Sequence, residues 1–95
     1  MIKHVVVFKL KNPKDAEVLK AKLMELEGIV DFIRFWEVGI NIGLSSKAYD
    51  VVAYSVFDNM DDLKTFRDHP KHIEIKNAIS AYIETSGTVD YASDQ

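Results

Sequence analysis

Two segments of the chain carry apolar side chains on both sides of a predicted strand. Residues 2–10 (IKHVVVFKL) and 50–57 (DVVAYSVF) are rich in β-branched and aromatic residues, which favour strands. Successive side chains of a strand point to opposite faces. In the first segment one face carries His4 and three apolar residues, and the other carries Val5 and Val7. Strands of this composition are usually buried on both sides, so the fold must cover both faces of its sheet.

The other segments predict one sheet and two helical stretches. Apolar residues recur at helical spacing between Asn12, which can cap a helix, and Gly28, which is suited to ending one. Strands are expected at 32–42 and 85–91, and a helix that Asp58 or Asn59 caps should break at Pro70 and resume to about Ala81. This order predicts an α+β fold, a ferredoxin-like βαββαβ sandwich with four antiparallel strands and both helices on one face.

Two helices on one face would leave the second apolar face of the sheet uncovered. An exposed apolar patch of that size would favour aggregation. A second copy of the same chain is the simplest cover, because a two-fold pairing of sheets is self-complementary. The sequence therefore predicts a homodimer that buries on the order of 1,500–2,500 Å². The alternative is a monomer with a partly hydrophobic surface.

Composition argues against several other classes of protein. Twelve basic and fifteen acidic residues give the 95-residue chain a net charge of −3, and its early lysines are interleaved with acidic residues, so no basic stripe for nucleic acid is present. The chain has no cysteine, which excludes disulfides and thiolate chemistry. The apolar run from Val5 to Phe8 is too short for a membrane span or a signal segment. We expect a cytoplasmic protein with neither a membrane nor a nucleic-acid partner.

The four residues HPKH, 69–72, raise the question of a histidine site. His72 shares a helical stripe with Ile75 and Ile79, so its ring should point toward the sheet. If the face of residues 2–10 that carries His4 also meets the helices, the two rings converge on one cavity. Two neutral imidazoles in an apolar cavity could move a proton or hold a carbonyl or enol oxygen. The alternative is a pair of core histidines hydrogen-bonded to the backbone.

His69 is a weaker candidate than His72 for contact with a ligand, and a metal site is weaker still. His69 precedes Pro70 and can cap the new helix, so contact with a ligand is the alternative for this residue. The three histidines have no carboxylate at a metal-ligand spacing, so no metal and no cofactor is expected. Trp36 and Tyr54 are expected to pack in the core or at the dimer seam.

Several stretches resemble a known family, the stress-responsive A/B barrel (Dabb) domain of the dimeric α+β barrel superfamily. They are KHVVVFKLK, VGIN, YDVVAYSVFDNMDDLKTF, HPKH and VDY, and the resemblance spans about residues 2–92. It implies a dimer whose two sheets face each other as a barrel. Some plant members are polyketide cyclases, and for them the resemblance implies a catalytic Tyr at the position of Phe66, paired with a His at the position of His72. His4 is also kept, but Val51 replaces a histidine expected on the third strand.

The sequence thus predicts a single Dabb domain over residues 1–95. We expect it to bind a small apolar molecule in an internal cavity, or to catalyse a cofactor-free reaction on it. One alternative is a structural or stress-linked interaction protein whose dimer is the functional unit; another is a cofactor-independent monooxygenase, by superfamily analogy. The missing tyrosine argues against polyketide cyclisation. The candidate residues are two histidines for catalysis and three aromatic rings for ligand contact, namely His72 and His4, and Phe66, His69 and Phe8.

Overall fold

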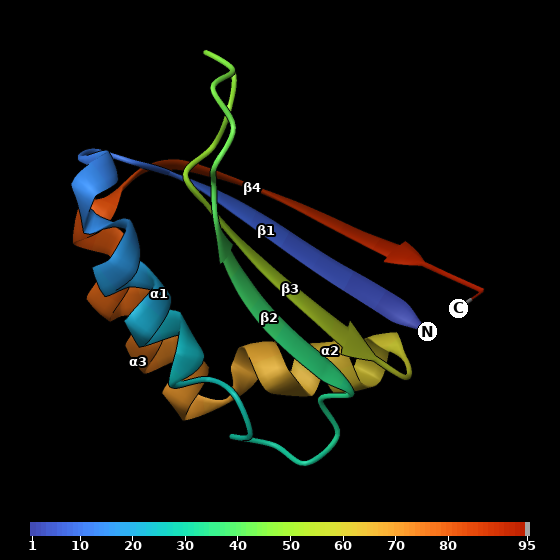
Figure 1. The fold of residues 1–95 in the computed structure, drawn as a ribbon. Coiled ribbons are helices and arrows are strands. Elements are labelled where there is room, and N and C mark those ends of the chain that lie inside the picture. The colour runs from blue at the N-terminus through green and yellow to red at the C-terminus, as the bar shows by residue number, and fades with distance from the viewer. Residues whose placement is uncertain (95) are drawn as a thin grey trace.

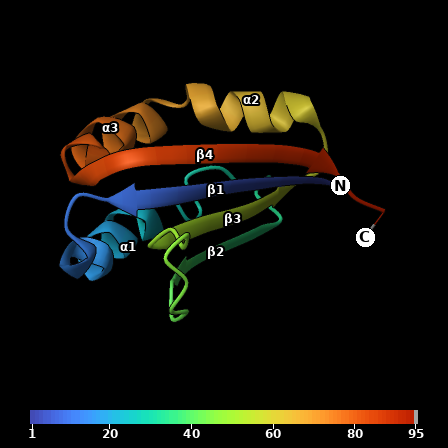
Figure 2. The ribbon, with the colours of Figure 1, turned by 90° about the horizontal axis from the view of Figure 1, so that it is seen from above.

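A computed structural model describes residues 1–94 and shows one four-stranded sheet with helices on one side (Figure 1). All neighbouring strands are antiparallel, in the order β2-β3-β1-β4, and the view from above shows them in this succession (Figure 2). The elements in chain order are β1 (Ile2–Leu10), a 3-10 turn (Pro13–Asp15), α1 (Ala16–Met24), β2 (Phe35–Ile40), β3 (Val51–Phe57), α2 (Met60–Asp68), α3 (Pro70–Ile79), a second 3-10 turn (Ser80–Tyr82) and β4 (Ile83–Ala92).

The hydrophobic core lies between the sheet and the three helices. In Figure 1 the helices lie below and to the left of the sheet, and the opposite side carries none. Apolar side chains from all of these elements are buried there, with the largest ones from β3, α1 and α2, namely Phe57, Phe66, Leu19 and Leu63. The predicted α+β class, antiparallel four-stranded sheet and one-sided helix layer are confirmed. No helix within residues 1–94 is both long and apolar enough to cross a membrane.

The start of α1 forms close to where the sequence predicts, and its end comes earlier than predicted. The Asn12 side chain accepts a hydrogen bond from the backbone N–H of Lys14 (3.0 Å), and Pro13 opens the first turn. That turn is 3-10, so the α-helix itself begins at Ala16. The α-helix ends at Met24, and turns lead from there to Gly28. Gly28 does have the left-handed conformation expected of it, with a φ of 77°, which glycine adopts without steric cost.

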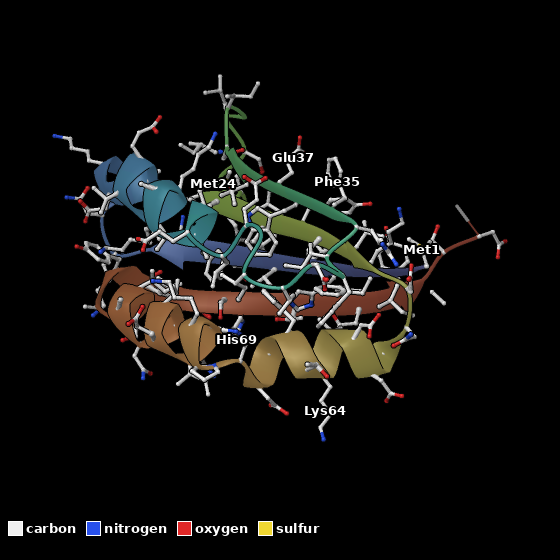
Figure 3. All side chains as sticks on the ribbon, turned by 90° about the horizontal axis from the view of Figure 1, so that it is seen from below. Met1, Met24, Phe35, Glu37, Lys64 and His69 are labelled. Carbon is white, nitrogen blue, oxygen red and sulfur yellow. The ribbon has the colours of Figure 1, made fainter. Side chains whose placement is uncertain are left out.

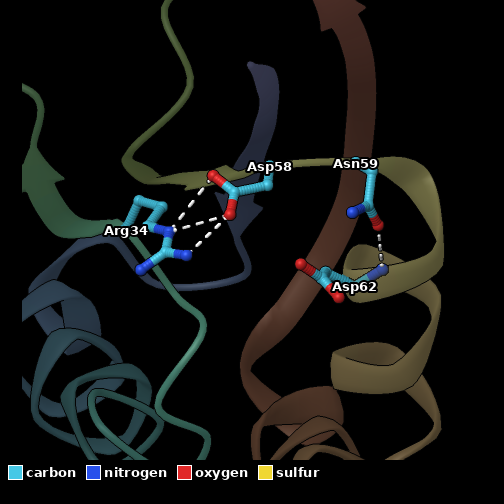
Figure 4. A network of polar contacts seen from close by, with 4 residues as sticks. All are labelled: Arg34, Asp58, Asn59 and Asp62. Atoms are coloured by element: carbon cyan, nitrogen blue, oxygen red, sulfur yellow. Dashed lines mark hydrogen bonds and ion pairs between the residues drawn. The ribbon is translucent and has the colours of Figure 1, made fainter.

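The entry of α2 is fixed by two polar contacts at the end of β3 (Figure 4). Asn59 caps the helix by accepting a hydrogen bond from the backbone N–H of Asp62 (2.8 Å). Just before the cap, Asp58 binds the guanidinium of Arg34 through both carboxylate oxygens (2.6–3.1 Å). Arg34 precedes β2, so this pair ties the start of β2 to the start of α2.

Pro70 separates α2 from α3, as predicted. His69 adopts an extended backbone conformation (φ −63°, ψ 135°) and is at once the C-cap of α2 and the N-cap of α3. Its Nδ1 accepts a hydrogen bond from the backbone N–H of Lys71 (3.0 Å), which satisfies a donor that Pro70 and the helix start would otherwise leave free. The junction sets the direction of α3 and therefore the position of His72.

Two strands have other boundaries than predicted, since β2 spans Phe35–Ile40 and not 32–42, and β4 spans Ile83–Ala92 and not 85–91. β2 ends at Ile40, and Ile42, which was expected on the strand, is 97% exposed in the loop that follows. The Asn41 side chain hydrogen-bonds to Gly43 through both its oxygen (3.1 Å) and its nitrogen (3.0 Å), which turns the chain out of the sheet and away from the helices (Figure 1). β4 is longer than the 85–91 segment predicted and pairs with β1 over its whole length.

Candidate functional site

A row of four side chains crosses the helix-covered face of the sheet. Paired positions on antiparallel neighbours share a face. The register pairs Ser55 of β3 with Trp36 of β2 on one side and with His4 of β1 on the other, and it pairs His4 with Asp90 of β4. One residue from every strand therefore contributes to the same line.

His4 is held at the β4 end of this row by Asp90. Its Nδ1 and Asp90 Oδ1 form a short hydrogen bond. Because a carboxylate only accepts hydrogen bonds, Nδ1 carries the proton of that bond. The Nε2 atom is then the one left for chemistry, and His4 itself is only 7% exposed. Arg67 of α2 approaches the other oxygen of Asp90 from above the sheet, with 3.9 Å between Nη1 and Oδ2.

A cavity of about 500 Å³ lies between this part of the sheet and the helices α1, α2 and α3. His4 and His72 both line it, as the sequence analysis expected, and so do Phe8 and Phe66. The remaining wall is mostly apolar and comes from β1, β2, β3, α1, α3 and the start of β4: Val6, Leu23, Leu26, Trp36, Ala53, Ile75, Ile79 and Ile83. The volume suits a small organic molecule.

Three aromatic rings stand side by side on one wall of the cavity. Phe66 packs edge-to-face against His72, with ring centroids 4.9 Å apart, and in the same manner against Trp36 at 5.7 Å. Phe66 is 1% exposed, so it positions both neighbours from within the core. The other two rings each present a polar atom beside an apolar surface.

Those two polar atoms have no partner in the part of the chain that the structure describes. Trp36 Nε1 and His72 Nδ1 are both buried, and neither makes a hydrogen bond within residues 1–94. A buried polar group without a partner is costly, and most native proteins contain few of them. Because both residues line the cavity, a ligand could satisfy them.

The environment of His72 lowers the pKa of its ring and so favours the neutral form. Burial lowers the pKa of His72 below its usual 6.5, as expected for an imidazole beside apolar side chains. Positive charge on His4, and then on Lys76 and Arg67, lowers that pKa further. An interaction with the backbone of Arg67 acts in the opposite direction. The two histidines therefore differ, since only His4 has a carboxylate partner.

The cavity opens along β4, where its lining becomes polar. The exposed lining residues are two cations and three hydroxyls: Arg67, Lys76, Ser80, Ser86 and Thr88. Sequence reasoning missed this mouth and also Asp90. Lys76 could have been found, since it follows His72 by four residues and so shares its side of the helix. Asp90 could not, because its pairing with His4 depends on a register between segments 86 residues apart.

Two predicted positions lie outside the cavity. His69 is not part of the lining; it caps α3 at the bend that Figure 3 shows between α2 and α3. Val51, which stands where the resemblance implies a histidine, is 2% exposed in the core, and Ala53 is the β3 residue that lines the cavity. In the described residues no three His, Asp or Glu side chains gather as a metal-binding group.

Comparison with known proteins finds relatives in bacteria. An uncharacterized protein of Streptomyces coelicolor is 36% identical over 78 residues, which cover 76% of this chain and 79% of that protein. A dimeric ferredoxin-like protein of unknown function from Bacteroides fragilis has 29% identity and a TM-score of 0.81, covering 97% of this chain and 95% of that one. One from Thermobifida fusca, also dimeric, has 22% identity and a TM-score of 0.85, covering 97% and 90%.

Two enzymes share the fold at lower identity. A hydroxynitrile lyase from Passiflora edulis has 18% identity and a TM-score of 0.81, covering 99% of this chain and 94% of that one. SnoaB, a cofactor-independent oxygenase from Streptomyces nogalater, has 17% identity and a TM-score of 0.75, covering 99% and 93%. At these identities the likeness shows the fold alone.

The sequence profile of one family covers nearly the whole chain. The Dabb profile, described as the stress responsive A/B barrel domain, matches residues 2–93. This agrees with the antiparallel sheet, the single helix layer and the HPKH junction described above. The protein therefore belongs to the stress responsive A/B barrel domain family.

Proposed function

We propose that the protein binds a small, mainly apolar molecule in the 500 Å³ cavity and transfers a proton on it without a cofactor. One observation carries this proposal: His4 and His72 line the same cavity, and only His4 is paired with a carboxylate. An imidazole that gains a proton is stabilised by a carboxylate on its far nitrogen. His4 Nε2 is therefore the better base, and His72 is the better neutral hydrogen-bonding partner.

The proposed step moves one proton from the ligand to His4. Nε2 accepts it from an acidic C–H or O–H group, and Asp90 stabilises the imidazolium that forms. The electron pair left on the ligand is delocalised onto an oxygen, which accepts a hydrogen bond from the neutral His72 ring. Phe66 has no hydroxyl, so the tyrosine-dependent reaction of plant cyclases is not part of this proposal.

A second copy of the chain completes the proposed assembly. The helix-free face of the sheet leaves Phe35 48%, Val89 60% and Tyr91 47% exposed, which is apolar area that a second sheet could cover. The Thermobifida and Bacteroides proteins, which share the fold, are dimeric. We propose that two copies pair through these faces as a barrel, which leaves one cavity in each protomer.

The three histidines of the chain allow a direct test by NMR. Spectra that correlate ring nitrogens with ring protons give separate signals for His4, His72 and His69, and the neutral dye N-phenyl-1-naphthylamine serves as the apolar probe. We expect saturable shifts at His4 and His72 and none at His69, which lies outside the cavity. Equal shifts at all three rings, or no shift at the two cavity histidines, would contradict the proposal.

The role of Asp90 as a positioning residue is tested in the same spectra. In the wild type His4 should carry its proton on Nδ1. Asp90→Asn can still accept that hydrogen bond but removes the negative charge, so the tautomer should be kept while the protonated ring is less stable. Asp90→Ala also removes the acceptor, so His4 should no longer favour the tautomer with its proton on Nδ1. Identical His4 signals in all three proteins would show that Asp90 does not position the ring.

A further inference from the structure

The mouth of the cavity has a charge that the rest of the molecule does not share. The chain as a whole has a net charge of −3, but the lining of the cavity contains two cations, Arg67 and Lys76, and no carboxylate. Three hydroxyl-bearing residues complete the mouth, and hydroxyls can donate hydrogen bonds to an anion. The opening along β4 is therefore electropositive and rich in donors.

Lys76 has no acidic partner of its own in the described residues. The ion pairs there involve other cations: Arg34, Lys71, and Arg67 at a long 3.9 Å from Asp90. Lys71, five residues earlier in the sequence of α3, lies between Glu74 (2.8 Å) and Glu25 (3.4 Å). Two lysines of one helix are thus in opposite situations, since the one outside the cavity is neutralised and the one at its mouth is not.

A second depression continues outward from the same mouth. It has a volume of about 450 Å³ and shares Arg67, His72 and Lys76 with the cavity. Its own charged residues are Lys64 and Asp68, so cations outnumber carboxylates there as well. Figure 3 shows Lys64 on the outer side of α2, and this residue also lines the depression. Positive charge therefore extends from the cavity mouth to the surface.

We infer that the ligand is an amphipathic anion, whose carboxylate or similar monoanionic head lies between Arg67 and Lys76 while its apolar body occupies the cavity beside Trp36 and Phe66. The inference rests on the proposed function, because it assigns a ligand class to that same cavity. Asp90 does not oppose the head group strongly, since its oxygens are already engaged by His4 and by Arg67. A carboxylate head could also accept a hydrogen bond from the neutral His72 ring, whose buried Nδ1 has no partner in the described residues.

The test compares octanoate with 1-octanol, which share an eight-carbon chain and differ in the charge of the head. Each of the two ligands is titrated against bound N-phenyl-1-naphthylamine in the wild type and in the variants Lys76→Gln, Arg67→Gln and Lys71→Gln. The measured quantity is the ratio of octanoate affinity to octanol affinity. Lys76→Gln should lower this ratio about three- to tenfold, the range for a charged contact at a partly exposed site. Arg67→Gln should lower it less, because Asp90 partly neutralises Arg67.

The control and the outcomes separate this inference from the proposed function. Lys71→Gln removes the same charge from the same helix outside the cavity and should leave the ratio unchanged. Added salt should weaken octanoate more than octanol in the wild type. A ratio that stays constant in Lys76→Gln, or that falls equally in Lys71→Gln, overturns the anionic ligand but leaves apolar binding intact. If the dye itself fails to bind, the proposed function fails, and the ligand class fails with it.

Discussion

The two faces of the sheet are built from the same four strands but differ in where their polar and apolar side chains lie. The helix-covered face has a full apolar core and yet contains the polar row of Trp36, Ser55, His4 and Asp90. The helix-free face has little polar chemistry at its centre, where Val7 pairs with Val52, and it leaves large apolar side chains in solvent. The helix-covered face therefore contains polar groups, and the helix-free face exposes apolar ones.

β4 shows this inversion most clearly. Its residues Ser86, Thr88 and Asp90 face the helices, whereas Val89 and Tyr91 face the side without helices. An edge strand of a monomer normally places its apolar residues inward. The reversed order makes sense if the inner side borders a cavity that a polar ligand group enters, and the outer side meets another sheet. The difference between the faces fits the proposal that one of them binds a ligand and the other pairs with a second chain.

The largest effect is expected from a charge at the centre of the helix-free face. Val52→Asp should dissociate the proposed dimer or unfold it, because an unpaired charge buried there costs on the order of several kcal/mol. Sedimentation at micromolar concentration should give about twice the 10.8 kDa protomer mass for the wild type and a lower mass for the variant. Ile42→Asp, at a position 97% exposed in the β2–β3 loop, should change neither. A wild type that sediments as a monomer would contradict the proposal that the helix-free face pairs with a second chain.

A cavity-wall truncation should affect the other face. Phe66→Ala removes a ring that is 1% exposed and should lower the free energy of unfolding by about 3–5 kcal/mol. Phe66→Leu keeps more of the volume and should cost less. Denaturant unfolding measures the loss, and sedimentation of the folded fraction should still show the proposed dimer. If the folded variant instead sedimented as a monomer, the two faces of the sheet would not be independent.

The helix junction should contribute a smaller amount. Pro70→Ala should lower the free energy of unfolding by only about 1 kcal/mol, because proline at the first helical position acts mainly by restricting the unfolded chain. Thermal unfolding measures this difference. His69 still caps α3 in the variant, so the ring signals of His4 and His72 should not move. A large loss of stability, or displaced cavity signals, would mean that Pro70 itself positions the covered face.

The smallest effect should be the pH dependence that His72 contributes, since its ring is only half-buried. Its pKa is lower in the folded protein than the usual 6.5, so near that pH the unfolded chain binds more protons. The stabilisation that His72 contributes should therefore be complete above about pH 6.5, the usual pKa of histidine. As the pH falls below that value, the free energy of unfolding should decrease. His72→Gln should remove this part of the pH dependence, which unfolding titrations on either side of that pH would measure. An unchanged pH profile in the variant would show that His72 is not desolvated.

Much of the fold could be predicted because it depends on local chemistry. The alternation within residues 50–57 placed Val51 and Ala53 on one face and Val52 on the other, and in the structure the first two are buried while Val52 is half-buried. Pro70 marked the break between α2 and α3 through its missing N–H and the strain it places on the residue before it. The site was half predictable for the same reason, since the helical stripe of His72 could be counted along the chain.

The rest of the site depends on contacts that no local pattern contains. Asp90 becomes the partner of His4 only through the β1–β4 register, and β4 itself was underestimated because its inward residues are polar. Lys76 looks like any surface lysine until the cavity beside it is known. Trp36 was expected in the core or the seam, and the cavity between the sheet and the helices gives it a third environment.

The row across the sheet has a consequence for a chain that is being synthesised. β4 comes last among the strands, so a nascent chain that has reached residue 82 already contains Trp36, Ser55, His4 and His72. It lacks Asp90, and with it the partner of His4, and the edge where the cavity opens is still missing. Since β4 pairs with β1, the first strand made, the site becomes complete only when the two ends of the fold meet. Truncated translation products would therefore hold most of the site's residues, including His4, and still lack the carboxylate that positions its ring.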